Sequence, residues 1–190
     1  MRNPKDGTPL VWDGDFDNAM TVASTSGSPA SIDSVDYATY FRNRLYAIVD
    51  KDTVRYSDLI DLVNWQAVVN EFTFNSGSDD QLVAVVPRDD NTLIVFKDQS
   101  IYAITGISST LSAPLLQLLT EEYGLVSRLA AKRVGDDTIF LSERGLFTVN
   151  QTLENKLRAE SKPITFDISK TFNRINKKYL SKAAMGFNNN

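Results

Sequence analysis

Residues 81–106 read QLVAVVPRDDNTLIVFKDQSIYAITG, and two other stretches of the chain share this outline. Residues 36–58 read DYATYFRNRLYAIVDKDTVRYSD, and residues 128–150 read RLAAKRVGDDTIFLSERGLFTVN. Each stretch predicts an apolar strand, a polar turn, a second strand, a second polar turn and a third strand. Self-similarity at a fixed spacing indicates a repeat architecture, which constrains the fold more than any single residue does.

The spacing of the repeat is nearly the same at two independent positions. The residues that open the second strand lie 48 and 46 positions apart: Leu45, Leu93 and Ile139. The residues that mark the third strand lie 47 and 45 positions apart: Val54, Ile101 and Leu146. We therefore take the repeat to be about 46 residues long.

The predicted strands are apolar on both faces, as RLYAIV (44–49) and TLIVFK (92–97) show. Strands of this kind are covered on both sides, which fits sheets stacked face to face. Tight hairpins are expected at FRNR, PRDDN and VGDD, and the second turns are DKD, KDQ and SERG. A fourth, outer strand is expected in each unit: EFTFN (71–75), APLLQLL (113–119) and KLRAES (156–161).

Four-stranded units of this length are typical of a β-propeller, so the predicted fold class is an all-β propeller. About three units are nearly complete and two are partial, so we expect the chain to be an arc of a larger ring. The predicted bounds are 1–35 for a partial preceding blade and loop, 36–80, 81–127 and 128–166 for three blades, 167–180 for a helix, and 181–190 for the first strand of a further, incomplete blade.

One amphipathic helix is predicted near the C-terminus, at residues 167–180. Its apolar face comprises four residues at helical spacing: Ile168, Phe172, Ile175 and Tyr179. Asp167 is the expected N-cap, and the remaining surface carries basic residues: Lys170, Arg174, Lys177 and Lys178. An ordinary solvated face is the default interpretation of these bases, and nucleic-acid binding is the alternative.

Earlier in the chain, Ser57 is expected to cap a short helical turn, with Trp65 packed beneath it as a core residue.

Composition excludes several kinds of chemistry. The 190 residues are 42% apolar, which suffices for a core, and they include no Cys and no His. Disulfides, zinc fingers and Cys or His nucleophile–base pairs are therefore excluded. The N-terminus has no apolar signal core, and no run of residues is long and apolar enough for a membrane span.

The charge is unevenly placed. The chain carries a net charge of -4, but residues 151–190 hold eight bases and three acids, and residues 1–150 hold 12 bases and 21 acids. The two parts therefore differ in sign, at +5 and -9. Two solvated surfaces would explain this difference, and so would a basic tail that docks onto an acidic partner.

Acidic pairs are the main candidates for catalysis or metal binding: Asp79-Asp80, Asp89-Asp90, Glu121-Glu122 and Asp136-Asp137. Asp89-Asp90 and Asp136-Asp137 occupy the same hairpin in successive repeats, so we interpret them as turn residues. Asp13, Asp15 and Asp17 have the spacing that opens a calcium loop, but Asn18 and Ser24 stand where glycine and glutamate are needed. A polar turn is the better account, and the sequence assigns no catalytic, cofactor-binding or metal-ligating residue.

The order of the motifs resembles a known family. RNRLYAIVDKDTVRYSD is followed by a Trp turn, then LIVFKDQSIYAITG, then YGLVSRLAAKRVGDDTIFLSERGLFTV and an amphipathic helix. Over about residues 36–187 this order is similar to the propeller of bacteriophage tail proteins of the nozzle, hub or DNA-stabilisation type. The resemblance implies a non-enzymatic virion protein, assembled in the host cytoplasm as a homo-oligomeric ring with portal, adaptor and other tail proteins. Such a ring plugs the DNA exit channel and opens during genome ejection.

The resemblance also implies that DNA passes through the ring without sequence-specific binding. An acidic body suits such a channel, because like charge opposes phosphate binding. Two other functions are open. A propeller module that binds carbohydrate or a host receptor would need exposed aromatic residues along a pocket. A propeller hydrolase would need convergent carboxylates.

Overall fold

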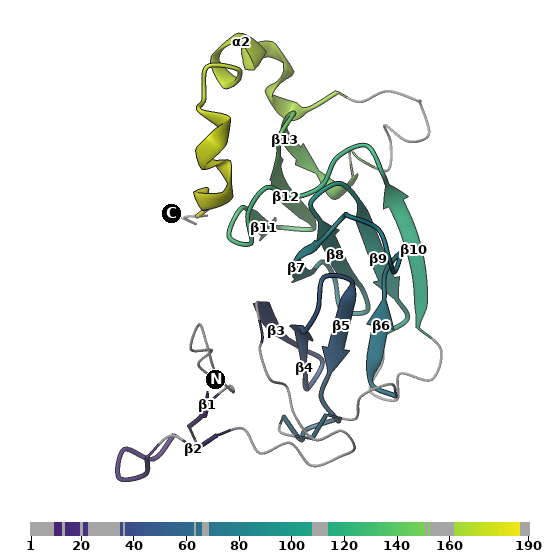
Figure 1. Cartoon of the computed structure of the whole chain (residues 1–190), viewed down its shortest axis with the longest axis vertical. Helices are drawn as coiled ribbons and strands as arrows, with labels where there is room; N and C mark the ends of the chain where they lie inside the picture. The colour runs from purple at the N-terminus through teal and green to yellow at the C-terminus, as the bar shows by residue number, and fades with distance from the viewer. Residues whose placement is uncertain are drawn as a thin grey trace. The chain divides into compact units, whose positions relative to one another are not determined.

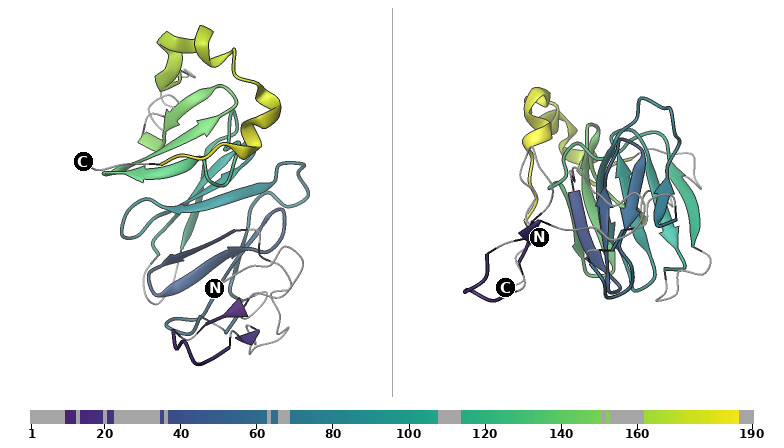
Figure 2. Two further views of the ribbon diagram at one scale, coloured as in Figure 1. Left: turned by 90° about the vertical axis from the view of Figure 1, so that its left-hand side faces the viewer. Right: turned by 60° about the horizontal axis from the view of Figure 1, so that its bottom comes forward.

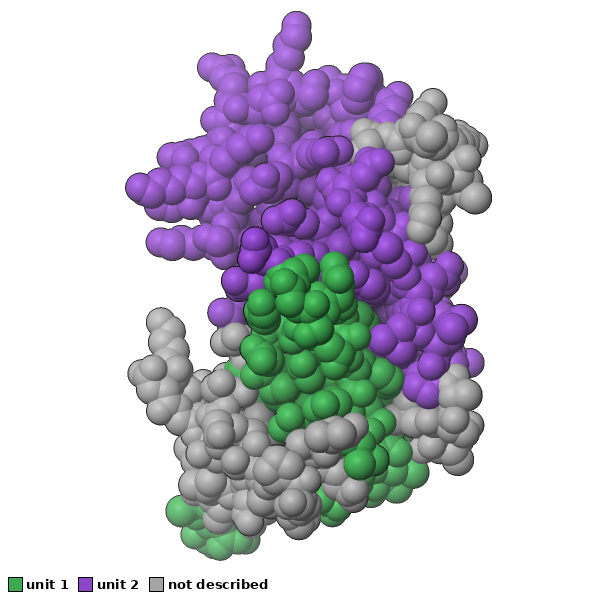
Figure 3. Space-filling model, turned by 45° about the vertical axis from the view of Figure 1, so that its right-hand side comes forward, with its two compact units in different colours: residues 1–78 green, residues 79–190 purple. Residues whose placement is uncertain are grey.

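The computed structural model describes residues 10–12, 14–19, 21–22, 35, 37–62, 64–65, 69–107, 114–150, 152 and 162–186. The protein is mostly β, with short antiparallel sheets and little helix (Figure 1, Figure 2). This confirms the all-β class. The chain divides into two compact units, residues 1–78 and residues 79–190 (Figure 3). Within the described residues, no helix has the length and apolar character needed to cross a membrane.

The first unit contains a four-stranded antiparallel meander, with the strands in chain order: β3 (Tyr37–Phe41), β4 (Arg44–Ile48), β5 (Thr53–Tyr56) and β6 (Glu71–Thr73). Arg42 and Asn43 form the two-residue β3–β4 turn, and both have positive φ angles, of 49° and 60°. A turn of this hand matches the twist of the strands it joins, so the predicted FRNR hairpin is confirmed. A separate antiparallel pair is formed by β1 (Leu10–Val11) and β2 (Thr21–Val22).

Trp65 anchors the core of the first unit, as predicted. Its side chain is buried against Val35 and Ala47, and its indole nitrogen donates to the Leu62 carbonyl at 2.9 Å. The prediction for Ser57 is wrong, because its hydroxyl accepts a hydrogen bond from the Leu45 backbone N–H at 3.0 Å. Ser57 therefore extends the pairing of β4 and β5 instead of capping a helical turn.

The second unit contains two sheets, and both follow the predicted repeat. The first is a four-stranded meander: β7 (Leu82–Pro87), β8 (Leu93–Lys97), β9 (Ile101–Thr105) and β10 (Leu115–Thr120). The second has three strands: β11 (Ala131–Val134), β12 (Asp137–Ser142) and β13 (Gly145–Thr148). The expected outer strands at 71–75 and 113–119 appear as β6 and β10, and the third, at 156–161, lies outside the described residues.

The core of the second unit is aliphatic in one sheet and aromatic in the next. All five residues of β8 are buried, which confirms that this strand is covered on both faces. In β12, buried and partly buried residues alternate, so only one face packs inward. Phe140 of β12 lies 5.1 Å from Phe96 of β8 and 5.8 Å from Phe147 of β13, measured between ring centroids. These rings hold the two sheets of the unit together.

The predicted helix at 167–180 is wrong as a continuous element. The structure has three short pieces instead: η1 (Ile164–Ile168), α2 (Ser169–Phe172) and η2 (Lys177–Lys182). Asp167 lies inside η1 and is not an N-cap. The Asn176 side chain accepts from the Lys178 backbone N–H and starts a new turn, which competes with helix continuation. The segment is also rich in Ile, Thr, Phe and Asn, which have only modest helix propensity.

Residues at the two ends also differ from the prediction. The expected first strand of a further unit at 181–190 is absent from residues 181–186, because η2 continues through Lys182. Ala184 instead forms an isolated parallel bridge with Leu129, and the Met185 N–H donates to the Leu129 carbonyl at 2.8 Å. Residues 187–190, and most of residues 1–35, lie outside the described part of the chain.

Candidate functional site

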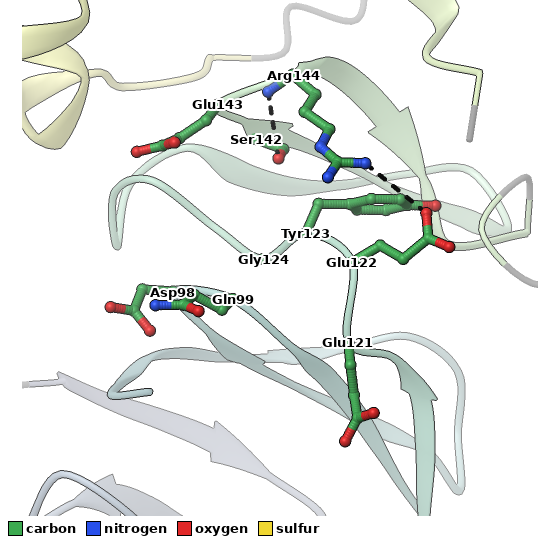
Figure 4. A pocket seen from close by; sticks show the side chains of 9 residues that line it. All are labelled: Asp98, Gln99, Glu121, Glu122, Tyr123, Gly124, Ser142, Glu143 and Arg144. Atoms are coloured by element: carbon green, nitrogen blue, oxygen red, sulfur yellow. Dashed lines mark hydrogen bonds and ion pairs between the residues drawn. The ribbon is translucent and has the colours of Figure 1, made fainter. Parts of the chain in front are cut away.

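A groove of about 320 Å³ lies on the second unit, and we call it the acidic groove (Figure 4). It is built by the β8–β9 turn, the segment that follows β10, and the β12–β13 turn. The first and last of these are the equivalent second turns, KDQ and SERG, of successive repeats. The lining residues are Asp98, Gln99, Glu121, Glu122, Tyr123, Gly124, Ser142, Glu143 and Arg144.

Gly124 sets how closely the walls of the groove approach each other. A Cβ at this position would overlap the backbone carbonyl oxygen of Lys97 and would lie 2.7 Å from that of Asp98. The next residues are held by backbone bonds on both sides, from the Leu125 N–H to Lys97 O at 2.9 Å and from the Val126 N–H to Leu141 O at 3.1 Å. The segment after β10 is therefore fixed between the two sheets.

Tyr123 forms part of the groove but belongs mostly to the core. Its side chain is 5% exposed, and its ring is stacked on Phe147 with centroids 4.2 Å apart and an interplanar angle of 14°. It also stacks on Phe140 at 6.3 Å. A ring covered in this way offers no open platform for the face of a sugar.

The charge of the groove is negative. Four carboxylates line it, from Asp98, Glu121, Glu122 and Glu143, and Arg144 is the one base among the lining residues. Arg144 Nη1 lies 3.8 Å from Glu122 Oε2, with side chains 57% and 60% exposed, so this pair adds little stability. Among the described residues, Glu121 and Glu143 form no ion pair, and both extend away from Arg144 in Figure 4.

A pair of carboxyl groups, Asp80 and Asp98, lies at one end of the groove. Asp98 Oδ1 accepts from the Gln81 N–H at 2.9 Å, and Asp80 accepts from the Gln99 N–H at 2.9 Å and from the Ser100 hydroxyl. Partial burial, the larger cause, and the hydrogen bond to Asp80 together raise the pKa of Asp98 to about 6. Burial opposes ionisation of Asp80 too, but the hydrogen bond from Asp98 and the other donors outweigh it and lower its pKa.

Below about pH 6 the two carboxyl groups therefore share one proton, which Asp98 carries and donates to Asp80. Lys97, fully buried at the end of β8, also contributes to the lowered pKa of Asp80 through its positive charge. The donors Gln81, Gln99 and Ser100 belong to the β8–β9 turn or to the segment before β7. These hydrogen bonds fix the β8–β9 turn.

The four acidic pairs identified in the sequence do not gather at one site. Asp89 accepts from the Asn91 N–H at 2.9 Å in the β7–β8 turn, as predicted. Asp136 lies in the β11–β12 turn as predicted, whereas Asp137 is the first residue of β12 and accepts from the Thr138 N–H at 2.7 Å. Glu121 and Glu122 line the acidic groove, and Asp79 is exposed. Sequence reasoning missed Asp98 and Glu143, although their positions in equivalent turns were visible from the repeat.

Asp15 and Asp17 form a polar turn. Asp15 Oδ1 accepts from the Asp17 N–H at 3.1 Å, and its carbonyl accepts from the Trp12 indole at 2.7 Å. Asp13 lies outside the described residues. Over the described ranges, no three acidic side chains gather in a way that would hold a metal ion.

A second surface is formed by residues 162–186, which we call the C-terminal arm. The arm runs along one side of the β11–β13 sheet (Figure 1, Figure 2). Three apolar residues of the predicted helix face are exposed, by 57%, 47% and 55%: Ile168, Ile175 and Tyr179. The arm carries six bases and one acid, a net charge of +5: Lys162, Asp167, Lys170, Arg174, Lys177, Lys178 and Lys182.

No protein-family model matches the chain, and no curated protein shows significant similarity to it. The structure itself defines a mostly β protein built from repeated antiparallel sheets. Its second unit carries two surfaces of opposite charge, the acidic groove and the C-terminal arm.

Proposed function

We propose that this protein is a structural component of a bacteriophage tail, in which its repeated sheets belong to a β-propeller. The observation that carries the proposal is the succession of antiparallel meanders at a spacing of about 46 residues. The quoted family motifs fall on equivalent parts of this repeat. LIVFK and IYAIT are β8 and β9, and FLS and GLF lie in β12 and β13.

In the proposed role, subunits assemble into a homo-oligomeric ring around the DNA exit channel, together with portal, adaptor and other tail proteins. The ring retains the packaged genome and opens during ejection. Carboxylates such as Glu121 and Glu143, which form no ion pair among the described residues, suit a surface past which DNA must move, because they repel the phosphate backbone. The role requires no catalytic residue.

The groove favours this role over binding of carbohydrate. Sugar recognition would benefit from an exposed aromatic ring, and the Tyr123 ring is stacked inside the core. A hydrolase would need two carboxyl groups directed at one substrate. The Asp80–Asp98 pair instead binds backbone N–H groups of its own turn and of the segment before β7.

Electron microscopy of purified tail particles tests the proposal, with a gold-labelled antibody raised against this chain. We expect label on the tail axis and a density ring that the chain fits. A matched preimmune serum gives the background. Particles that lack the chain, or label scattered over the capsid surface, would contradict the proposed role.

A further inference from the structure

The C-terminal arm holds an apolar and cationic surface outward. Thr165 anchors the start of the arm, because its hydroxyl accepts from the Leu146 N–H at 3.2 Å. Phe172 and Leu180 are buried, and Ala184 and Met185 pair with Leu129 at the other end. The arm is thus fixed at both ends, and the exposed face between the anchors needs little further ordering when it binds.

Four bases of the arm lack carboxylate partners within the described structure. Lys170, Arg174, Lys177 and Lys178 form no ion pair there. Lys182 lies over the ring of Tyr179, 5.5 Å from its centroid. The arm therefore exposes apolar and basic groups together. Such a surface suits a partner surface that offers both carboxylates and apolar contact.

A second copy of the chain offers that complement. The acidic groove exposes Glu121 and Glu143, which form no ion pair among the described residues, and residues 1–150 carry a net charge of -9. The arm, in contrast, carries +5. Within one molecule, no arm cation lies within ion-pair distance of a described groove carboxylate. Contact between copies would therefore bring Glu121 and Glu143 together with arm bases that form no ion pair among the described residues.

We propose that the C-terminal arm of one copy binds the acidic groove of another copy. The bases of the arm pair with Glu121 and Glu143, and Ile175 and Tyr179 supply apolar contact at its centre. This inference deepens the proposed tail function, since it names the contact that would link subunits of the ring. The proposed contact between arm and groove does not depend on how many subunits the ring contains.

Nucleic acid is the competing occupant of the arm, because six bases also attract phosphate. Two observations favour the second copy. The exposed Ile168, Ile175 and Tyr179 are interspersed with the bases, and the rest of the chain repels nucleic acid by its own negative charge. A fluorescently labelled DNA duplex serves as the probe for this alternative.

The test is a charge swap measured by analytical ultracentrifugation of the whole chain. One variant reverses the arm, Lys177→Glu with Lys178→Glu, and a second reverses the groove, Glu121→Lys with Glu143→Lys. Each variant alone is expected to weaken self-association by about tenfold or more. An equimolar mixture of the two is expected to recover association, because the reversed arm of one copy then faces the reversed groove of the other.

Matched controls reverse charges of the same unit at the β11–β12 hairpin: Lys132→Glu and Asp136→Lys. These are expected to leave self-association unchanged, and circular dichroism checks that every variant is folded. The wild-type association is expected to weaken between about 0.05 M and about 0.5 M salt, as the screening length shortens. Replacing Ile175 by Asn is expected to weaken association at both salt concentrations, since it removes apolar contact.

Three results would overturn the inference: a wild-type chain that stays monomeric, reversed variants that associate like the wild type, or a mixture that does not recover association. Binding of the DNA duplex by a monomeric chain, lost in the arm variant, would assign the arm to nucleic acid. A dimer that follows the charge swap would support this contact while contradicting the proposed ring. If the antibody did not label tails, the proposed tail function would be contradicted, but the proposed contact between arm and groove would not be.

Discussion

Replacing Asp98 by Asn is expected to stabilise the second unit at neutral pH, although it removes a charged group. In the native protein, protonated Asp98 donates to Asp80 and accepts from the Gln81 N–H. An Asn amide has both a donor and an acceptor, so it can make the same two bonds at every pH. The variant therefore reproduces permanently the state that the native pair holds only below about pH 6.

The magnitude follows from the pKa of Asp98, which is raised from 3.8 to about 6. A group with a raised folded pKa stabilises the protein below its unfolded pKa, and this contribution is lost as pH rises through about 6. At about 1.4 kcal/mol per pKa unit, the full loss would be about 3 kcal/mol. Because the Asp98 side chain is exposed, solvent screening reduces this, and we expect the variant to gain about 1 kcal/mol near neutral pH.

Asp80 acts in the opposite direction. Its pKa is lowered, so its contribution is present above the ordinary value of 3.8 and is lost as pH falls through the lowered value. For the native pair, stability is therefore highest at about pH 4 and falls as pH rises from there to about 6. The high-pH decline is expected to disappear in Asp98→Asn, and the low-pH decline is expected to remain.

Denaturant unfolding of both proteins at several values between about pH 5 and about pH 8 measures the difference in the free energy of unfolding. The advantage of the variant is expected to be smallest near the lower limit, to grow as pH rises to about 6, and to stay constant above that. Asp136→Asn, which removes one carboxylate from an exposed hairpin, is the matched control and is expected to differ from the native chain by a constant amount. An Asp98→Asn protein that is less stable at the upper limit, or a difference that does not change with pH, would refute the shared proton.

Three further substitutions test the packing. Gly124→Ala places a Cβ against the Lys97 carbonyl oxygen and is expected to cost about 3 kcal/mol, measured by denaturant unfolding, whereas an unchanged midpoint would contradict the close approach. Gly145→Ala is strained at a φ of +144° and pushes Thr165 away, so faster hydrogen exchange is expected in residues 162–186, and unchanged exchange would show that this anchor does not hold the arm. Trp65→Ala is expected to cost about 4 kcal/mol in the first unit, and a loss below about 1 kcal/mol would exclude it as a core anchor.

The strands were predictable because their signals are local. Alternating apolar residues and turn chemistry located the strands of all three large sheets, and β6 and β10 followed from the need for an outer strand. The helix prediction failed because spacing alone was used. Ile168, Ile175 and Tyr179 have helical spacing, but α2 ends at Phe172 and the Asn176 side chain caps a separate turn, η2.

The acidic groove could not be assembled from the sequence, because its walls come from segments far apart in the chain. Asp98 and Glu143 are separated by 45 residues and meet only when two sheets of one unit pack together. The close approach at Gly124 gave no signal either, since a glycine in a loop has many roles. The repeat itself contained the one usable clue, that KDQ and SERG are equivalent turns.

That clue extends to the first unit. Its equivalent turn, DKD, carries Asp50 and Asp52, so the second turn of each repeat contains a carboxylate. Strand residues are constrained by packing on both faces, whereas a turn residue needs only to suit the turn. In a protein of this kind, charge can therefore change at the turns and in the C-terminal arm without loss of the sheets. The acidic groove and the arm lie at such positions, so we expect charge reversal there to change what the protein binds and to leave its fold intact.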